Sequence, residues 1–220
     1  MAISKFTNEP TTDWSTPAHR KKQEQAIAAV RAALGREYPN IIGGSEVTSA
    51  GKFPSINPSN ANEVVGTFQL GTAEDAVRAL DAAWKAFDSW KQVPAAKRAE
   101  YLFKAAKIMR RRRFELNAVM MFEVGKSWAE ADADTAEAID FAEFYGREML
   151  RYAGAKLPVQ LKGERDEIVY LPLGVGIVIP PWNFPLAILT GMTLAAVVTG
   201  NTVVLKPSSD SPLIGYKLME

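Results

Sequence analysis

The sequence predicts an α/β fold, and three patterns along the chain lead to this expectation. Residues 72–150 carry apolar side chains at helical spacing. Residues 38–71 instead alternate short β-branched runs with Gly, Pro, Asn and Ser, which is typical of small strands and tight turns. From residue 174 the pattern becomes strand, helix, strand. Two apolar strands joined by a crossover helix are expected to lie parallel in one sheet.

The composition is that of a chain that can bury a core. The 220 residues are 47% hydrophobic and 23% charged. Lys and Arg number 26 against 25 Asp and Glu, and this net charge of +1 argues against nucleic acid or an anionic membrane as the main partner. The longest apolar stretch, 184–199, is too short and too interrupted to span a membrane, and the N-terminus lacks the apolar core of a signal peptide. We therefore expect a cytoplasmic protein.

Two residue counts exclude whole classes of chemistry within this polypeptide. There are 0 Cys, so disulfides, thiolate zinc sites and a cysteine nucleophile are excluded. The single histidine, His19, lies in a polar amphipathic stretch, so we expect neither a histidine metal cluster nor a Ser-His triad. The sequence predicts no metal site.

The first half of the chain carries recognisable helix boundaries. Residues 16–34 are predicted to form a helix that stops at Gly35. Thr72 and Asp75 are spaced as a capping box for the next helix, and Pro94 is expected in the first turn of the one after it.

The helical layer is completed by two predicted segments, 114–123 and, after Gly125, 128–150. The four arginines at 110–113 are interpreted as lying near a helix C-terminus, where the helix dipole favours positive charge.

Residues 151–173 have a sequence pattern that differs from that of the helical segments before them. Two apolar runs flank the charged, glycine-containing turn KGERD, which predicts a hairpin that projects from the body. Such a hairpin either pairs with another subunit or remains a plain surface feature, and the pattern alone favours neither.

The last segment, 174–220, holds the predicted strand–helix–strand unit and the start of one more helix, with Ser211 as its N-cap and Pro212 at its first position. One such unit cannot close a doubly wound sheet. The chain is therefore expected to be cut off from a longer protein.

Ligands of open parallel sheets bind beyond the carboxyl ends of the strands, and two such ends are predicted here. The first carries PPWNF at 180–184 and the second carries KPSS at 206–209. Because the two strands are expected to be neighbours, both segments should face one crevice.

The first strand end offers a rigid bend, since prolines fix φ and remove backbone donors. The amide of Asn183 could donate to an oxyanion, and Trp182 could form the wall of a cofactor site. The alternative is a rigid turn in which Asn183 caps a helix opened by Pro185.

At the second strand end, Lys206 could donate to ribose hydroxyls or attract phosphate, and Ser208 and Ser209 could add hydroxyl donors. The alternative is a lysine that marks the emergence of the strand into solvent. The glycines at 174–177 lack the spacing of a dinucleotide fingerprint.

Acidic residues also cluster on the predicted helix 128–150. Glu137 or Asp140 could bind a substrate ammonium, beside Asp132 and Asp134. From the pattern alone, a solvated acidic face is the preferred interpretation.

Two motifs together carry a family resemblance. PWNFP at 181–185, followed by TGNTVVLKPS at 199–208, resembles the aldehyde dehydrogenase superfamily, and the resemblance extends over nearly the whole chain, including INPSNANEVVG at 56–66. Within the superfamily, residues 41–44, 123–141 and 170–185 are similar to the branch that acts on 1-pyrroline-5-carboxylate.

The resemblance implies the N-terminal part of a Rossmann-like cofactor domain, with a helical layer and a projecting β-hairpin. It divides the chain into a helical and small-strand part (1–150), an oligomerisation hairpin (151–173) and the first βαβ unit of the cofactor domain (174–220). The catalytic domain would lie outside this chain, and the enzyme would be a homo-oligomer.

The implied activity is the NAD-dependent oxidation of L-glutamate γ-semialdehyde, a small-molecule aldehyde, to L-glutamate in proline catabolism. The implied roles are an oxyanion donor (Asn183), cofactor contacts (Ile179, Pro180, Pro181, Trp182, Lys206, Ser208 and Ser209) and substrate contacts (Glu137 and Phe184). In the family a cysteine attacks the aldehyde, hydride passes to NAD, and water hydrolyses the thioester.

The chain departs from the family pattern in two ways. Ser209 stands where many NAD-preferring relatives have a glutamate, so NADP use is also plausible. The missing cysteine means that the isolated chain is expected to be inactive. A non-catalytic nucleotide-binding module and a purely structural fragment therefore stay open as alternatives.

Overall fold

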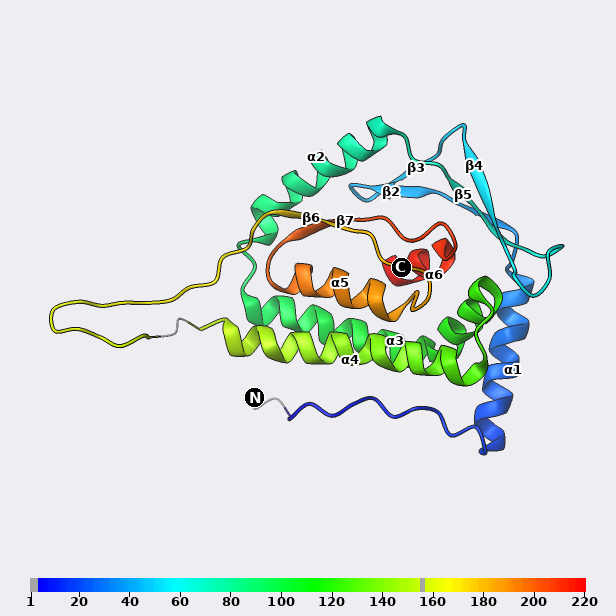
Figure 1. Cartoon of the computed structure of the whole chain (residues 1–220), viewed down its shortest axis with the longest axis horizontal. Coiled ribbons are helices and arrows are strands. Elements are labelled where there is room, and N and C mark those ends of the chain that lie inside the picture. The colour runs from blue at the N-terminus through cyan, green and yellow to red at the C-terminus, as the bar shows by residue number, and fades with distance from the viewer. Residues whose placement is uncertain (1–3, 155–156) are drawn as a thin grey trace.

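The computed structural model describes residues 4–154 and 157–220, and it arranges them as an α/β fold (Figure 1). The helices are α1 (Pro17–Ala32), α2 (Ala73–Trp90), α3 (Ala95–Val124), α4 (Trp128–Tyr152), α5 (Ala187–Val198) and α6 (Pro212–Met219). The strands are β1 (Arg36–Tyr38), β2 (Asn40–Ile42), β3 (Ser45–Val47), β4 (Lys52–Ile56), β5 (Val64–Gln69), β6 (Val175–Val178) and β7 (Thr202–Leu205). Residues 1–3, which belong to the predicted helical and small-strand part (1–150), lie outside the described residues.

The strands form three small sheets. In the first, β5 lies between β1, which is parallel to it, and β4, which is antiparallel. β2 and β3 form an antiparallel pair. β6 and β7 are parallel, and α2 and α5 pack on either side of them (Figure 1). The predicted βαβ unit is therefore present as β6–α5–β7.

The helical layer consists of α3 and α4, which run along each other beneath α5 (Figure 1). Gly146 faces the Phe103 ring, and a Cβ atom at position 146 would lie 2.6 Å from it, so glycine permits this close helix contact. The core lies between this layer, α5, α6 and β5. Its fully buried members include Val65, Leu102, Met120, Ile139, Leu186 and Ile214.

The helix boundaries are mostly as predicted, with one large difference. The capping box of Thr72 and Asp75 is present at the start of α2. However, α3 is one uninterrupted helix of 30 residues, because its sequence holds no Gly or Pro before Gly125, where φ becomes positive at 69°. Pro94 occupies the N-cap of α3 rather than its first turn.

The interpretation of the arginine run at 110–113 was wrong. These residues lie in the middle of α3, where the helix dipole offers them little. Carboxylates pair with two of them instead: Arg110 pairs with Glu143 at 2.7 Å, and Arg113 pairs with Asp132 at 2.6 Å. Ion pairs with neighbouring segments therefore account for these two arginines.

The segment 157–173 projects from the body as an extended loop (Figure 1). Its described residues contain no strand, only an isolated bridge at Ile168, so the paired strands predicted for 151–173 are not seen in this part of the structure. Residues 151–152 belong to α4, and 155–156 lie outside the described residues. A two-stranded hairpin without a further partner is only marginally stable, which explains the missing pairing.

Candidate cofactor and oxyanion site

The carboxyl ends of β6 and β7 meet at one edge. Val178 is paired in register with Leu205, and the next backbone N–H, that of Lys206, donates to the Val178 carbonyl at 2.9 Å. We call residues 179–186, which follow β6, the first corner, and residues 206–211, which follow β7, the second corner. The predicted juxtaposition of the two strand ends is therefore confirmed.

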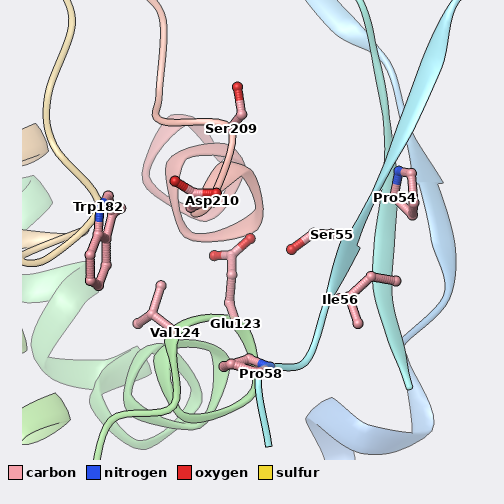
Figure 2. A pocket seen from close by; sticks show the side chains of 9 residues that line it. All are labelled: Pro54, Ser55, Ile56, Pro58, Glu123, Val124, Trp182, Ser209 and Asp210. Atoms are coloured by element: carbon pink, nitrogen blue, oxygen red, sulfur yellow. The ribbon is translucent and has the colours of Figure 1, made fainter. Parts of the chain in front are cut away.

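Both corners contribute to one cleft of about 500 Å³. Trp182 comes from the first corner, and Ser209 and Asp210 come from the second (Figure 2). The other lining residues come from β4 and the loop after it and from the end of α3: Pro54, Ser55, Ile56, Pro58, Glu123 and Val124. In Figure 2, the side chains of Trp182 and Glu123 flank a common space beside the second corner.

The Asn183 side chain is exposed, and no hydrogen bond ties it to any residue that the structure describes. The N-cap of α5 is Leu186, so the alternative in which Asn183 caps a helix opened by Pro185 is wrong. Pro185 lies two residues before the first helical residue, Ala187. The amide of Asn183 is therefore available to an external acceptor.

A buried carboxylate caps α5 instead. Asp134 Oδ1 accepts from the backbone N–H of Ala187 at 2.6 Å, and Oδ2 accepts from Lys126 Nζ at 2.7 Å. The same Lys126 Nζ lies 4.6 Å from the centre of the Phe184 ring. Burial raises the pKa of Asp134 from its ordinary value, while Lys126 and the Ala187 N–H oppose that shift.

A second buried carboxylate caps α6. Glu123 accepts from the backbone N–H groups of Leu213 at 2.5 Å and Ile214 at 2.9 Å. Burial raises the pKa of Glu123 to about 8, against the effect of these bonds and of one from Ser55. Ser211 occupies the predicted N-cap position, but its side chain makes no capping bond, so the expected role passes to Glu123.

The predicted cofactor residues are divided between the cleft and its surroundings. Trp182 and Ser209 line the cleft, whereas Ser208 is half-buried and accepts from the Asp210 backbone N–H at 3.2 Å. The Lys206 side chain is exposed and has no ion pair within the described residues. Among the remaining predicted residues outside the cleft lining, Ile179 and Pro181 are exposed and Pro180 is buried.

The acidic residues of α4 do not form the solvated face that was preferred from the pattern. Asp132 and Asp134 are fully buried, and Asp132 binds Arg113. Glu137 is exposed, and its pKa is raised by partial burial and by the charges of Asp134 and Asp140. Glu137 lies outside the lining of the cleft.

Sequence reasoning missed the two capping carboxylates, Glu123 and Asp134, and the Lys126 that pairs with one of them. A weak signal existed for Asp134, because it directly precedes Thr135 on the apolar side predicted for that helix. Nothing local marks Glu123, since its partners lie 90 and 91 residues further along the chain.

Comparison with known proteins identifies the family to which the chain belongs. The sequence model of the Aldehyde dehydrogenase family matches residues 46–220. A 1-pyrroline-5-carboxylate dehydrogenase of Geobacillus sp. (strain WCH70) is 49% identical over 99% of this chain and 42% of its own length. The chain thus spans about 42% of the length of the curated relatives that it matches.

Solved structures agree in fold. The chain superposes on the 1-pyrroline-5-carboxylate dehydrogenase from Thermus with bound NAD with a TM-score of 0.96 and 47% identity, covering 100% of this chain and 43% of that one. The Δ-pyrroline-5-carboxylate dehydrogenase from Mycobacterium tuberculosis bound with NAD gives a TM-score of 0.90 and 28% identity, covering 100% and 41%.

Proposed function

The chain belongs to the aldehyde dehydrogenase family, and from this premise we propose that it supplies the cofactor-binding part of a 1-pyrroline-5-carboxylate dehydrogenase. The enzyme would oxidise L-glutamate γ-semialdehyde to L-glutamate with NAD(P) in proline catabolism. One observation carries the proposal most strongly: Trp182 and Ser209, from two neighbouring strand ends, line one cleft, and the free amide of Asn183 adjoins Trp182 in the chain.

The residues of the two corners fit a dinucleotide. Lys206 offers an ammonium at the end of β7 that has no ion pair in the part of the chain that the structure describes, and Ser209 offers a hydroxyl inside the cleft. Both are donors suited to ribose or phosphate oxygens. When bound, NAD would accept the hydride that leaves the substrate. Ser209 carries no charge that would repel a 2′-phosphate, so we infer that NADP is also used.

The first corner would act on the substrate. The Asn183 amide would donate to the oxygen of the aldehyde as negative charge develops there, and it needs no change of protonation to do so. The Phe184 ring would pack against the aliphatic chain, and the Glu137 carboxylate would attract the substrate ammonium. With 0 Cys in this chain, the nucleophilic thiol must come from the longer protein.

A direct test uses an active enzyme that carries this chain. We expect oxidation of L-glutamate γ-semialdehyde with a kcat/KM at least tenfold above that for pentanal, an aldehyde with the same five-carbon chain but without the ammonium and carboxylate. Equal kcat/KM values for both aldehydes would agree with membership of the family but refute L-glutamate γ-semialdehyde as the specific substrate. If neither aldehyde is oxidised with NAD(P), the proposal that the protein is an aldehyde dehydrogenase is refuted.

The missing cysteine also supports a second candidate, a non-catalytic nucleotide-binding module. Titration of the isolated chain with NAD separates this candidate from a purely structural fragment, because only a nucleotide-binding chain shows saturation. Aldehyde oxidation by an enzyme that carries the chain would exclude both alternatives.

We further infer that the enzyme is a homo-oligomer in the cytoplasm and that the projecting segment 157–173 takes part in assembly. Its apolar side chains lie in the open, with Val159 86% and Leu173 96% exposed. Light scattering tests the assembly: Val159→Asp with Leu173→Asp should lower the mass, whereas Arg165→Asp at the tip should not. Cell fractionation tests the location.

A further inference from the structure

The first corner and the helix that follows it are attached to the helical layer at two points, and both points follow Asn183 in the chain. At one point, Asp134 binds the backbone N–H of Ala187, the first residue of α5, at 2.6 Å. At the other, the Lys126 ammonium lies 4.6 Å from the ring centre of Phe184. Asn183 directly precedes Phe184 in the chain, so the attachment reaches the residue next to the proposed oxyanion donor.

The two attachment points are one unit, because Lys126 Nζ and Asp134 Oδ2 form an ion pair at 2.7 Å. The side chain of Asp134 is 0% exposed and that of Lys126 is 12% exposed. Each oxygen of the carboxylate has a donor, one from Lys126 and one from Ala187. Removing either partner would leave a buried charge without compensation, so this pair has little freedom to rearrange.

We propose that Lys126 and Asp134 are positioning residues that together hold the Asn183 amide in its reactive place. Prolines at 181 and 185 already restrict the backbone on both sides of Asn183. The pair adds two fixed points, one between these prolines at the Phe184 ring and one after Pro185 at the start of α5. An oxyanion donor acts only within a narrow range of distance and angle, so small displacements of this corner would reduce turnover. This inference rests on the proposed function of Asn183.

The chain provides a matched control for the pair. Asp132 lies on the same helix, is also 0% exposed and forms a buried ion pair, with Arg113 at 2.6 Å. Its other partners are Asn117 and Thr12, at the N-terminal arm, and the first corner is not among them. Asp132→Ala therefore measures the loss of a buried α4 carboxylate without a change at the first corner.

The first measurement is amide hydrogen exchange on this chain. Asp134→Ala should speed exchange of the Ala187 amide at least tenfold, because it removes the only acceptor of this amide among the described residues. Asp132→Ala should leave that amide within twofold of the unaltered chain. Equal acceleration by both substitutions would show a general loss of stability and overturn the proposal.

The second measurement is steady-state kinetics of an active enzyme that carries the chain. Asp134→Ala and Lys126→Met should each lower kcat at least tenfold and change the KM for NAD by a smaller factor, since Lys206 and Ser209 of the second corner are untouched. Lys126→Arg keeps the charge and the cation–ring contact and should retain more of kcat than Lys126→Met. If Asp134→Ala does not fold, the comparison of Lys126→Arg with Lys126→Met still tests the proposal.

Unchanged kcat in Lys126→Met would overturn the proposal, as would equal losses in Asp134→Ala and Asp132→Ala. If the unaltered enzyme oxidises no aldehyde, the proposed function fails and the catalytic part of this inference fails with it. The exchange measurement then still decides whether the pair fixes the first corner, so the two failures can be told apart.

Discussion

The two corners share one architectural device but differ in charge. In each, a buried carboxylate from the helical layer caps the helix that follows the strand: Asp134 binds the start of α5, and Glu123 binds the start of α6. Asp134 has Lys126 as a partner, whereas no ion pair of Glu123 is found among the described residues. Helix N-termini favour negative charge, and Lys126 balances the charge of Asp134. Glu123 has a pKa raised to about 8 by burial, so below that pH it caps α6 as a neutral acid.

From this difference we infer that the two corners have different functions. The first corner is held by a neutralised pair and presents Asn183, a group that must be precisely placed. The second corner presents the exposed side chain of Lys206 and the hydroxyl of Ser209, which suit a cofactor held by several weaker contacts. The comparison predicts that loss of Asn183 from the first corner lowers turnover, whereas loss of Lys206 from the second corner weakens cofactor binding.

The largest effect is expected at the first corner. In an active enzyme that carries the chain, Asn183→Ala should lower kcat by about 10²–10³-fold, because its hydrogen bond strengthens as the oxyanion forms. The exposed Asn62 lies outside the cleft, and Asn62→Ala is the control. A kcat equal to that of the control would remove Asn183 from the oxyanion site.

A smaller effect of another kind is expected at the second corner. Lys206→Ala should raise the KM for NAD by roughly tenfold with little change in kcat, because a contact to bound cofactor is lost equally in ground and transition states. Lys107→Ala removes the same charge from the exposed side of α3 and should change neither constant. A fall in kcat with unchanged KM would contradict the division of duties.

The caps differ in their expected response to pH. The pKa of Glu123 is raised to about 8 from 4.5, so the folded protein holds a proton that the unfolded chain releases between these values. The free energy of unfolding should therefore decline as pH rises from about 5 to about 8, by roughly 3–4 kcal/mol from this group. Glu123→Gln cannot titrate and should flatten the decline.

The control for this experiment is Glu115→Gln on the same helix, a partly exposed carboxyl whose pKa Arg112 lowers rather than raises. This substitution should leave the decline in place. Denaturant unfolding at several pH values measures both variants. A decline that persists unchanged in Glu123→Gln would show that its carboxyl is already ionised across this range.

The smallest effect concerns cofactor choice. Ser209→Glu places a carboxylate in the cleft, where it would repel a 2′-phosphate and accept from a ribose hydroxyl. We expect the ratio of kcat/KM for NAD over NADP to rise several-fold, while Ser209→Ala leaves it near its starting value. A ratio that already strongly favours NAD, and does not move in Ser209→Glu, would refute NADP use.

The features predicted from sequence are those with a local cause. The β-branched runs around 175–178 and 202–205 identify two strands, and the intervening apolar segment identifies their crossover helix. Parallel strands then place Asn183 and Lys206 at one edge without any further information. The family resemblance adds roles to those residues, but the shared edge already follows from topology.

The features that sequence could not predict depend on distant contacts. The Asp134 cap joins residues 53 apart, and the Glu123 cap joins residues 90 apart. A four-arginine run gives no local sign that its partners are Glu143 and Asp132 rather than a helix end. The projecting segment has apolar runs suited to strands, yet an isolated pair has no sheet to complete.

The central claim is that the two corners form one cofactor site, and titration of this chain with NAD tests it most directly. Tryptophan fluorescence should change saturably, the change should shrink in Trp182→Phe, and the apparent Kd should rise roughly tenfold in Lys206→Ala but not in Lys107→Ala. Absence of saturation, or equal Kd values in the two lysine variants, would contradict a cofactor site at the ends of β6 and β7.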